Sequence, residues 1–434
     1  SIQSRKNLIL IHTYFSPNQN HFYTRTYMGI TKNDFVSQNH DTAEINTLLI
    51  HSDDVVNNRI VNDVAPPITV TTTFRYSSNP EDWIPWADQT PEEKEKLLNH
   101  DFVYSRLSHP NNVRLETNLN NIFDGYTTIY NSGLSAFNGI INYINPKQVF
   151  LPDCYHGIKS ICKIWERNYG TKVYNDIDEI FNHLQEGDLV HIENPINPFG
   201  TVIDIKKYID YAHEKKAYVV WDATFAPSPI IKNHWDFDPD FILHSLTKYY
   251  AGHSDLLAGC VVTKSSEIDT FLKNDRIYLG TNIGNLESFL LLRSLRSYEL
   301  RVEKQSSNAK KIVEWLADNK DKFNGNIIKV SHAITQRKEL ANKNQDVSFI
   351  DNLFNEDYTT PVFSVYLKDF NSCKTFIANL KYFQHATSLG GVESLVELRC
   401  LTDPNIDRNL IRISIGCESP KDLIKDIEQA LKKI

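Results

Sequence analysis

The segment from Asp240 to Lys248 combines a short apolar run with three side chains suited to chemistry. Residues 241–243 predict a buried strand, and the hydroxyls of Ser245 and Thr247 flank the Lys248 amine just after it. Two hydroxyls beside one amine suit a ligand that carries both a phosphate and an aldehyde. A lysine stored as an imine with such an aldehyde becomes a base once it is displaced. A surface lysine that follows a strand is the alternative interpretation of this segment alone.

Polar side chains also follow other short apolar runs of the chain. They are Asp153, Glu193 and Asp222, just past the runs at 149–151, 189–192 and 217–221. Runs that are apolar on both faces predict a parallel sheet with helices on each side. In such sheets chemistry gathers at the carboxyl ends of the strands. We therefore expect these carboxylates and Ser245 to lie along one edge of the sheet.

Asp222 lies one predicted strand before Lys248. A carboxylate at that strand end is placed to pair with a protonated pyridine nitrogen, which keeps the ring an electron sink for a substrate carbanion. An aspartate that only caps the next turn is the alternative. Pyridoxal 5′-phosphate (PLP) carries a phosphate, an aldehyde and a pyridine in one molecule. We therefore predict PLP as the cofactor, with Lys248 as its attachment point.

A small turn at Ser132-Gly133 separates a short apolar run from a helix-like segment. Backbone N–H groups at the start of a helix bind phosphate well, although most such turns only change the direction of the chain. Together with Ser245 and Thr247, this turn completes a predicted phosphate cup. Each charge-assisted hydrogen bond in it would contribute about 1.5–3 kcal/mol.

Four further residues supply groups that a PLP site needs. The string Tyr104-Ser105-Arg106 offers a guanidinium for a phosphate dianion, and Tyr155 offers an aromatic face for a flat ring. Arg412 interrupts the apolar run 410–415, where an arginine is either ion-paired or faces a ligand carboxylate. Packing or ordinary salt bridges would account for any one of these residues alone.

Composition narrows the class of protein. The chain has 434 residues, 41% hydrophobic and 23% charged, as in a globular protein of two or three domains. The net charge of −8 and the lack of a basic block argue against a nucleic-acid surface, and no apolar stretch is long enough to span a membrane. The six cysteines and 15 histidines are scattered, so we expect reduced thiols in a cytoplasmic protein and no metal site.

Four regions are predicted along the chain. Residues 1–41 form a poorly structured extension, 42–107 an N-terminal arm, 108–300 a large cofactor-binding domain and 301–434 a smaller C-terminal domain. The first acid is Asp34, so a mitochondrial transit segment is the minority interpretation of the extension. Within the last domain, residues 331–360 are polar and are expected to be a loop.

The motifs resemble, in order, those of the trans-sulfuration, or Cys/Met-metabolism, family of PLP enzymes. They include Tyr-Ser-Arg at 104–106, Ser-Gly-Leu at 132–134, Asp-Cys-Tyr at 153–155, Glu-Asn-Pro-Ile-Asn-Pro at 193–198, Asp-Ala-Thr-Phe-Ala at 222–226, Ser-Leu-Thr-Lys at 245–248, Gly-His-Ser-Asp at 252–255, Ser-Leu-Gly-Gly-Val-Glu-Ser-Leu at 388–395 and Arg-Ile-Ser-Ile-Gly at 412–416. The resemblance implies the α/β fold of type I PLP-dependent transferases. That fold is a mainly parallel seven-stranded sheet sandwiched by helices, with a smaller α+β C-terminal domain and an N-terminal arm.

The resemblance also implies a role for each motif residue. Lys248 would hold PLP, Asp222 would pair with the pyridine nitrogen, Tyr155 would stack on the ring and Asn197 would lie near the ring hydroxyl. The remaining cofactor contacts would come from Ser132, Gly133, Leu134, Thr224, Ser245 and Thr247. Tyr104 and Arg106 would reach the cofactor of a neighbouring subunit, so the family implies at least a dimer, usually within a homotetramer. Arg412 and Ser388 would hold the substrate carboxylate.

The chain departs from the family pattern at three positions that we expect to border the substrate. Thr387 stands where many γ-synthases and γ-lyases carry glutamate, immediately before Ser-Leu-Gly. His156 follows the stacking tyrosine in place of glycine or cysteine, and His109 replaces the asparagine three residues after Tyr-Ser-Arg. The sequence therefore predicts the cofactor more firmly than it predicts the substrate.

The predicted reaction is cleavage of a carbon–sulfur bond in cystathionine or a related thioether amino acid. Lys248 would take the Cα proton, Asp222 would keep the ring electron-poor, and Tyr155 or Tyr104 would assist proton transfer. One alternative is γ-replacement, which joins cysteine to an O-acylhomoserine. The other alternative is a family member that has lost catalysis and serves as a binding or structural subunit.

Overall fold

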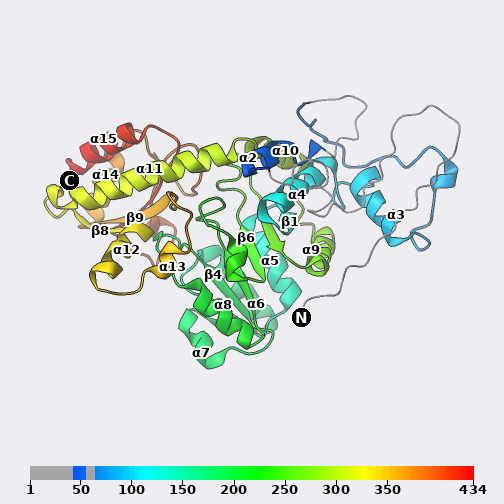
Figure 1. Ribbon diagram of the computed structural model, residues 1–434, viewed down its shortest axis with the longest axis horizontal. Helices are drawn as coiled ribbons and strands as arrows, with labels where there is room; N and C mark the ends of the chain where they lie inside the picture. The colour runs from blue at the N-terminus through cyan, green and yellow to red at the C-terminus, as the bar shows by residue number, and fades with distance from the viewer. Residues whose placement is uncertain (1–42, 55–63) are drawn as a thin grey trace.

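The computed structural model describes residues 43–54 and 64–434 (Figure 1), so the predicted extension 1–41 lies outside the described residues. The large domain lies between the arm, blue in Figure 1, and the C-terminal domain, yellow to red. Its seven-stranded sheet has the order β1-β7-β6-β5-β4-β2-β3. The strands are β1 (Tyr126–Tyr130), β2 (Gln148–Phe150), β3 (Lys172–Tyr174), β4 (Leu189–Glu193), β5 (Tyr218–Asp222), β6 (Phe241–His244) and β7 (Gly259–Thr263).

The sheet is mainly parallel, as predicted. Only β7 runs antiparallel to its neighbours β1 and β6, while β6, β5, β4, β2 and β3 pair in parallel. Every residue of β4 and β6 is buried, which explains why these runs are apolar on both faces.

Helices cover both faces of this sheet. The helices α5 (Gly133–Ile144), α6 (His156–Tyr169) and α9 (Ser266–Leu279) pack on one face, where Phe137 and Ile158 meet Val220 and Leu243. On the other face lie α4 (Pro110–Phe123), α7 (Ile180–His183), α8 (Ile205–Glu214) and α10 (Asn285–Leu295). The predicted three-layer α/β architecture is therefore confirmed.

The C-terminal domain is a second, five-stranded sheet with helices on it. Its order is β10-β11-β12-β9-β8, and only β10 runs parallel to its neighbour. The strands are β8 (Ile327–Ser331), β9 (Val362–Leu367), β10 (Gln384–His385), β11 (Leu395–Leu398) and β12 (Leu410–Ser414). The helices α14 (Phe370–Asn379) and α15 (Pro420–Leu431) close its core through Phe376, Leu423 and Ile427.

One long helix, α11 (Tyr298–Asn319), belongs to both domains. Its first turns place Tyr298 and Val302 in the core of the large domain, and its later turns place Ile312 and Leu316 in the C-terminal core. Figure 1 shows α11 running from the large domain to the end of the C-terminal domain. The predicted boundary at residue 301 therefore falls inside a continuous helix, which connects the two domains rigidly.

Residues 331–360 were expected to form a loop, and this prediction was wrong. They contain α12 (Ala333–Asn342) and α13 (Ser348–Asp351). At the start of α12, His332 and Thr335 form a reciprocal capping box, and only Ala333 and Thr335 of the helix are buried. A polar helix with so narrow a buried face gives little periodicity in the sequence.

The predicted arm, 42–107, has two parts. Its first helix, α2 (Ile45–His51), packs Leu49 into the core of the large domain against α4. The rest, from residue 64 to 107, is mostly exposed or half-buried and carries α3 (Pro91–Lys96), followed by a single wider turn at Leu97–Asp101. Trp83 and Trp86 on this segment are more than half exposed.

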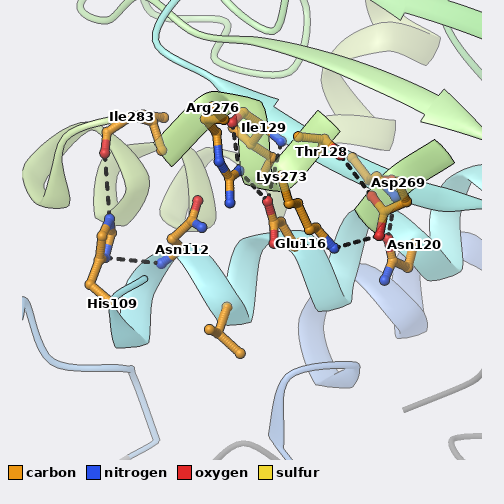
Figure 2. Close-up of polar contacts among 12 residues, drawn as sticks. His109, Asn112, Glu116, Asn120, Thr128, Ile129, Asp269, Lys273, Arg276 and Ile283 are labelled. Atoms are coloured by element: carbon orange, nitrogen blue, oxygen red, sulfur yellow. Dashed lines mark hydrogen bonds and ion pairs between the residues drawn. The ribbon is translucent and has the colours of Figure 1, made fainter. Parts of the chain in front are cut away.

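A buried polar network fastens α4 to α9 and β1 (Figure 2). Glu116 on α4 accepts a hydrogen bond from the Ile129 N–H at 3.2 Å and pairs with Arg276 Nη1 at 2.6 Å. Arg276 also donates to the Ile129 carbonyl at 2.7 Å. Burial raises the pKa of Glu116, but the charges of Arg276 and Lys273 more than offset burial, and the pKa lies below its ordinary value.

We expect Glu116→Gln to destabilise the fold by about 3–5 kcal/mol, because it leaves the Arg276 charge buried without its partner. Chemical denaturation measures this loss, with the exposed Glu428→Gln on α15 as the matched control, expected within about 0.5 kcal/mol of wild type. Because the folded pKa of Glu116 is depressed, its contribution is present near neutral pH and is lost as the pH falls through that pKa. Equal stabilities of the two variants would contradict this account.

Candidate active site

Lys248 lies in the turn that follows β6, with its amine enclosed between the two domains. Its Nζ donates to the Ser388 hydroxyl at 2.9 Å, and Ser388 comes from the C-terminal domain. Burial and the nearby Arg412 charge lower the pKa of Lys248 to about 8, although Glu397 opposes the shift. About a tenth of the amine is therefore neutral at pH 7, far more than for an ordinary lysine.

The α11 helix holds both sides of this amine. Arg301 donates to the Tyr249 carbonyl at 2.7 Å and to the Tyr250 carbonyl at 3.3 Å, so it fixes the turn after Lys248. One helical turn further on, Gln305 donates to the carbonyls of Gly390 and Gly391, at 3.1 and 2.6 Å. These two residues bring the Ser388 loop and the Lys248 turn to one place.

Asp222 ends β5 as a buried carboxylate. Its Oδ1 accepts a hydrogen bond from the Thr224 N–H at 3.0 Å. Burial raises the pKa of Asp222 to about 6, and the hydrogen bonds from Thr224 oppose the rise. Within the described part of the chain, neither a lysine nor an arginine pairs with Asp222, and the His191 imidazole lies 3.9 Å from its Oδ2.

A second buried carboxylate, Glu193, ends the neighbouring strand β4 directly opposite Asp222. Its Oε2 accepts the Tyr155 N–H at 2.6 Å. Burial and the adjacent Asp222 charge raise the pKa of Glu193 well above its ordinary value. Glu193 therefore fixes the backbone of Tyr155 beside the carboxyl end of β4.

The residues of the predicted phosphate cup meet at the start of α5. Ser132 caps the helix by accepting the Ser135 N–H at 3.0 Å, and the first intrahelical hydrogen bond begins at Ala136. The N–H groups of Gly133 and Leu134 precede that bond, so the helix itself does not use them. A Cβ on Gly133 would lie 3.2 Å from Ser245 Cβ, which shows how closely the two walls of the cup approach.

The hydroxyls of Thr247 and Thr224, two predicted cofactor ligands, form hydrogen bonds with the backbone around the cup. Thr247 Oγ1 donates to the Ala258 carbonyl at 3.1 Å and accepts the Ala258 N–H at 3.0 Å. Thr224 Oγ1 accepts the Ser245 N–H at 3.0 Å. These bonds fix the loop on which Ser245 and Lys248 lie.

Tyr155 directly precedes α6 and is 37% exposed. A Cβ on the next glycine, Gly157, would lie 2.5 Å from the Tyr155 ring. His156 packs beside it, with ring centroids 4.5 Å apart. Gly157 is therefore needed for the position of the tyrosine ring.

Arg412 on β12 is buried beside Lys248 and is ion-paired. Its Nη1 donates to Asn197 Oδ1 at 3.2 Å and its Nη2 to the Ser388 carbonyl at 2.7 Å. The same Nη2 lies 2.5 Å from Glu397 Oε2 on the neighbouring strand β11. Burial lowers the pKa of Arg412 to about 10, and Glu397 opposes this shift.

Glu397 is shared by two buried guanidinium groups. Its other oxygen, Oε1, accepts a hydrogen bond from Arg399 Nη1 at 2.9 Å. Arg399 also lies 4.0 Å from Asp403 Oδ2, so Arg412 is the guanidinium of this cluster that lies beside Lys248 and suits a substrate carboxylate. Sequence reasoning missed Glu397 and Arg399. Their signal was two opposite charges two residues apart at the end of an apolar run, with Glu397 on β11 and Arg399 in the turn directly after it.

The remaining predicted residues lie elsewhere in this single chain. Tyr104 and Arg106 stack on each other on the exposed arm, with the guanidinium 5.5 Å from the ring centroid, and Arg106 donates to the Ile277 carbonyl. Thr387 is exposed on the loop before Ser388. His109 was expected to border the substrate, but it caps α4, accepting the Asn112 N–H at 3.2 Å (Figure 2). Burial lowers the pKa of His109 to about 4.

None of the helices within the described residues is both long and apolar enough to cross a membrane. Among the same residues, no group of three or more histidine, cysteine, aspartate or glutamate side chains is arranged to hold a metal ion.

The residues that the structure gathers fit PLP. A buried amine of lowered pKa suits an aldehyde, a buried carboxylate without a lysine or arginine partner suits a pyridinium, and the free N–H groups at the start of α5 suit a phosphate. Lys248, Asp222 and the Gly133-Leu134 turn would hold these three parts of the cofactor. The fold and the site together define a PLP-dependent α/β enzyme.

Comparison with known proteins agrees with this assignment to the PLP-dependent enzymes. The chain belongs to the Cys/Met metabolism PLP-dependent enzymes, whose family model matches residues 46–432. It is 30% identical to cystathionine beta-lyase of Lactococcus lactis subsp. cremoris over 77% of this chain and 89% of that protein. Identity to cystathionine gamma-synthase of Mycobacterium bovis is 28%, over 76% and 86%. The crystal structure of cystathionine gamma-lyase from yeast superposes with a TM-score of 0.75 at 26% identity, covering 90% and 98%.

We expect Glu397→Gln to lower the pKa of Lys248 below about 8, because Glu397 is the group that opposes its fall. The pH dependence of Lys248 acetylation in the PLP-free protein, followed by peptide mass spectrometry, measures this pKa. Glu428→Gln is the control and should leave the profile unchanged. An unchanged or raised pKa in Glu397→Gln would contradict the proposed electrostatics of the site.

Proposed function

We propose that this protein is a PLP-dependent carbon–sulfur lyase that acts on cystathionine or a related thioether amino acid. The observation that carries the proposal is the meeting of Lys248 with Ser388 and Arg412 at the junction of the two domains. An amine and a carboxylate-binding guanidinium side by side are what a reaction at the Cα of an amino acid requires.

Each side chain has a distinct task in this reaction. Bound PLP supplies the electron sink that stabilises a negative charge at the substrate Cα. Arg412 holds the substrate carboxylate, and Asp222 keeps the ring nitrogen protonated. The Lys248 amine, held by Ser388, would remove the Cα proton. The Cβ–S bond would then break, with the sulfur leaving with the bonding electron pair, and Tyr155 would supply the proton to that sulfur.

Two observations favour cleavage at Cβ. The first relatives are cystathionine beta-lyases, at 30% identity. Thr387 also lacks the carboxylate that many γ-specific members carry before Ser-Leu-Gly. The gamma-synthase relatives, at 28% identity, make γ-replacement on an O-acylhomoserine the second candidate.

A substrate panel separates the candidates. We expect cystathionine to yield pyruvate with the wild-type enzyme, because elimination at Cβ releases that product after hydrolysis. Release of 2-oxobutanoate would mean cleavage at Cγ, and cystathionine formed from cysteine and O-acylhomoserine would mean γ-replacement. Lys248→Ala should lose at least about a thousandfold in turnover, as for other groups that act directly on the reacting atoms. Wild-type turnover in Lys248→Ala would overturn the proposal.

We also propose that the active unit of this protein is at least a dimer, and that two such dimers form a homotetramer. The exposed arm, with Tyr104 and Arg106 on it, supports this proposal because its apolar side chains, Trp83 and Trp86 among them, need a covering surface. In such a dimer, Arg106 would complete the cofactor site of the other subunit.

Mixing two inactive variants tests the shared site. After dissociation and reassembly, equal amounts of Lys248→Ala and Arg106→Ala should recover about a quarter of the wild-type activity. Half of the dimers are then mixed, and each mixed dimer has one intact site. Native mass spectrometry verifies that mixed dimers form. If they form without any recovered activity, Arg106 does not act across subunits.

A further inference from the structure

His191 on β4 lies on the same face of the sheet as both buried carboxylates. Side chains two residues apart on a strand share a face, so His191 lies beside Glu193. The register places Glu193 opposite Asp222 and His191 opposite Val220. Asp222 is therefore the diagonal neighbour of His191, within reach of a long side chain. Its Oδ2 lies 3.9 Å from His191 Nε2.

The imidazole of His191 is fully buried and has no hydrogen-bond partner on either ring nitrogen within the described residues. Its ring packs edge-on against Phe137 of α5, with centroids 5.4 Å apart. Burial lowers the pKa of His191 to about 3, so the ring is neutral and carries one N–H. An unpaired buried polar group is unfavourable, which means that this N–H needs an acceptor.

Asp222 Oδ2 is the acceptor in reach. The other carboxylate oxygen, Oδ1, already accepts the Thr224 N–H. Glu193 shares the face and accepts the Tyr155 N–H, but within the described residues its carboxylate makes no hydrogen bond or ion-pair contact with the His191 ring. An approach of about 1 Å would bring Nε2 and Oδ2 to hydrogen-bond distance, and such bonds often tighten only when a site is filled.

We propose that His191 is a positioning residue for the cofactor: its Nε2–H donates to Asp222 and holds that carboxylate ionised and aimed at the ring nitrogen of PLP. This inference rests on PLP as the cofactor of the family and not on the substrate or the reaction. A charge-assisted hydrogen bond to the carboxylate favours its charged form, which is the form that pairs with a pyridinium.

The test compares two variants of His191 and two cofactors. His191→Phe keeps an aromatic ring against Phe137 and removes the N–H, whereas His191→Gln supplies an amide N–H near the position of Nε2. The second cofactor is 1-deaza-PLP, in which carbon replaces the ring nitrogen. It still has the aldehyde and the phosphate, but it has no ring nitrogen for the Asp222 carboxylate to pair with. The readout is the equilibrium dissociation constant of each cofactor from the whole protein.

We expect His191→Phe to weaken PLP binding at least about tenfold. His191→Gln should recover most of this loss, and binding of 1-deaza-PLP should be the same for all three proteins within about twofold. Equal weakening of both cofactors in His191→Phe would indicate a merely structural role and overturn the proposal, as would unchanged binding of PLP. Because binding is measured without substrate, failure of the proposed carbon–sulfur cleavage would leave this test unaffected.

Discussion

The site depends on two opposite charges that the fold buries without pairing them to each other. Lys248 is held by a neutral hydroxyl, and Asp222 by a backbone N–H. Burying an unpaired charge costs several kcal/mol, and the lowered pKa of Lys248 and the raised pKa of Asp222 both express this cost. A ligand with an aldehyde and a pyridinium removes the cost of burying both charges, because the aldehyde reacts with the Lys248 amine and the pyridinium pairs with Asp222. The binding of PLP therefore also stabilises the folded state.

The surrounding structure serves to keep these two groups in place. The carboxyl ends of β4, β5 and β6 position Glu193, Asp222 and the Lys248 turn, as expected for a parallel sheet. From the other side, α11 fixes the Lys248 turn through Arg301 and the Ser388 loop through Gln305. Because α11 enters both cores, the substrate side and the cofactor side of the site are parts of one rigid unit.

Much of this arrangement was predictable from the residues alone. Apolar runs ending in Glu193, Asp222 and Ser245 predicted both the parallel sheet and its chemical edge, because burial on both faces leaves a clear signature in the sequence. The polar helix α12 was missed since its narrow buried face leaves no such signature. The motif resemblance predicted that Arg412 faces a ligand, while its pairing with Glu397 depends on the register of β11 and β12. The proximity of His191 to Asp222 likewise depends on the register between β4 and β5, which the sequence of either strand alone does not give.

The most direct test of the central claim is to locate the covalent bond between PLP and the protein. Borohydride reduction of the PLP-loaded enzyme makes that bond permanent, and peptide mass spectrometry then identifies the modified lysine. The account predicts stoichiometric modification of Lys248, the buried amine that Ser388 holds beside Arg412. Modification of a different lysine, or no modified lysine in protein loaded with PLP, would contradict it.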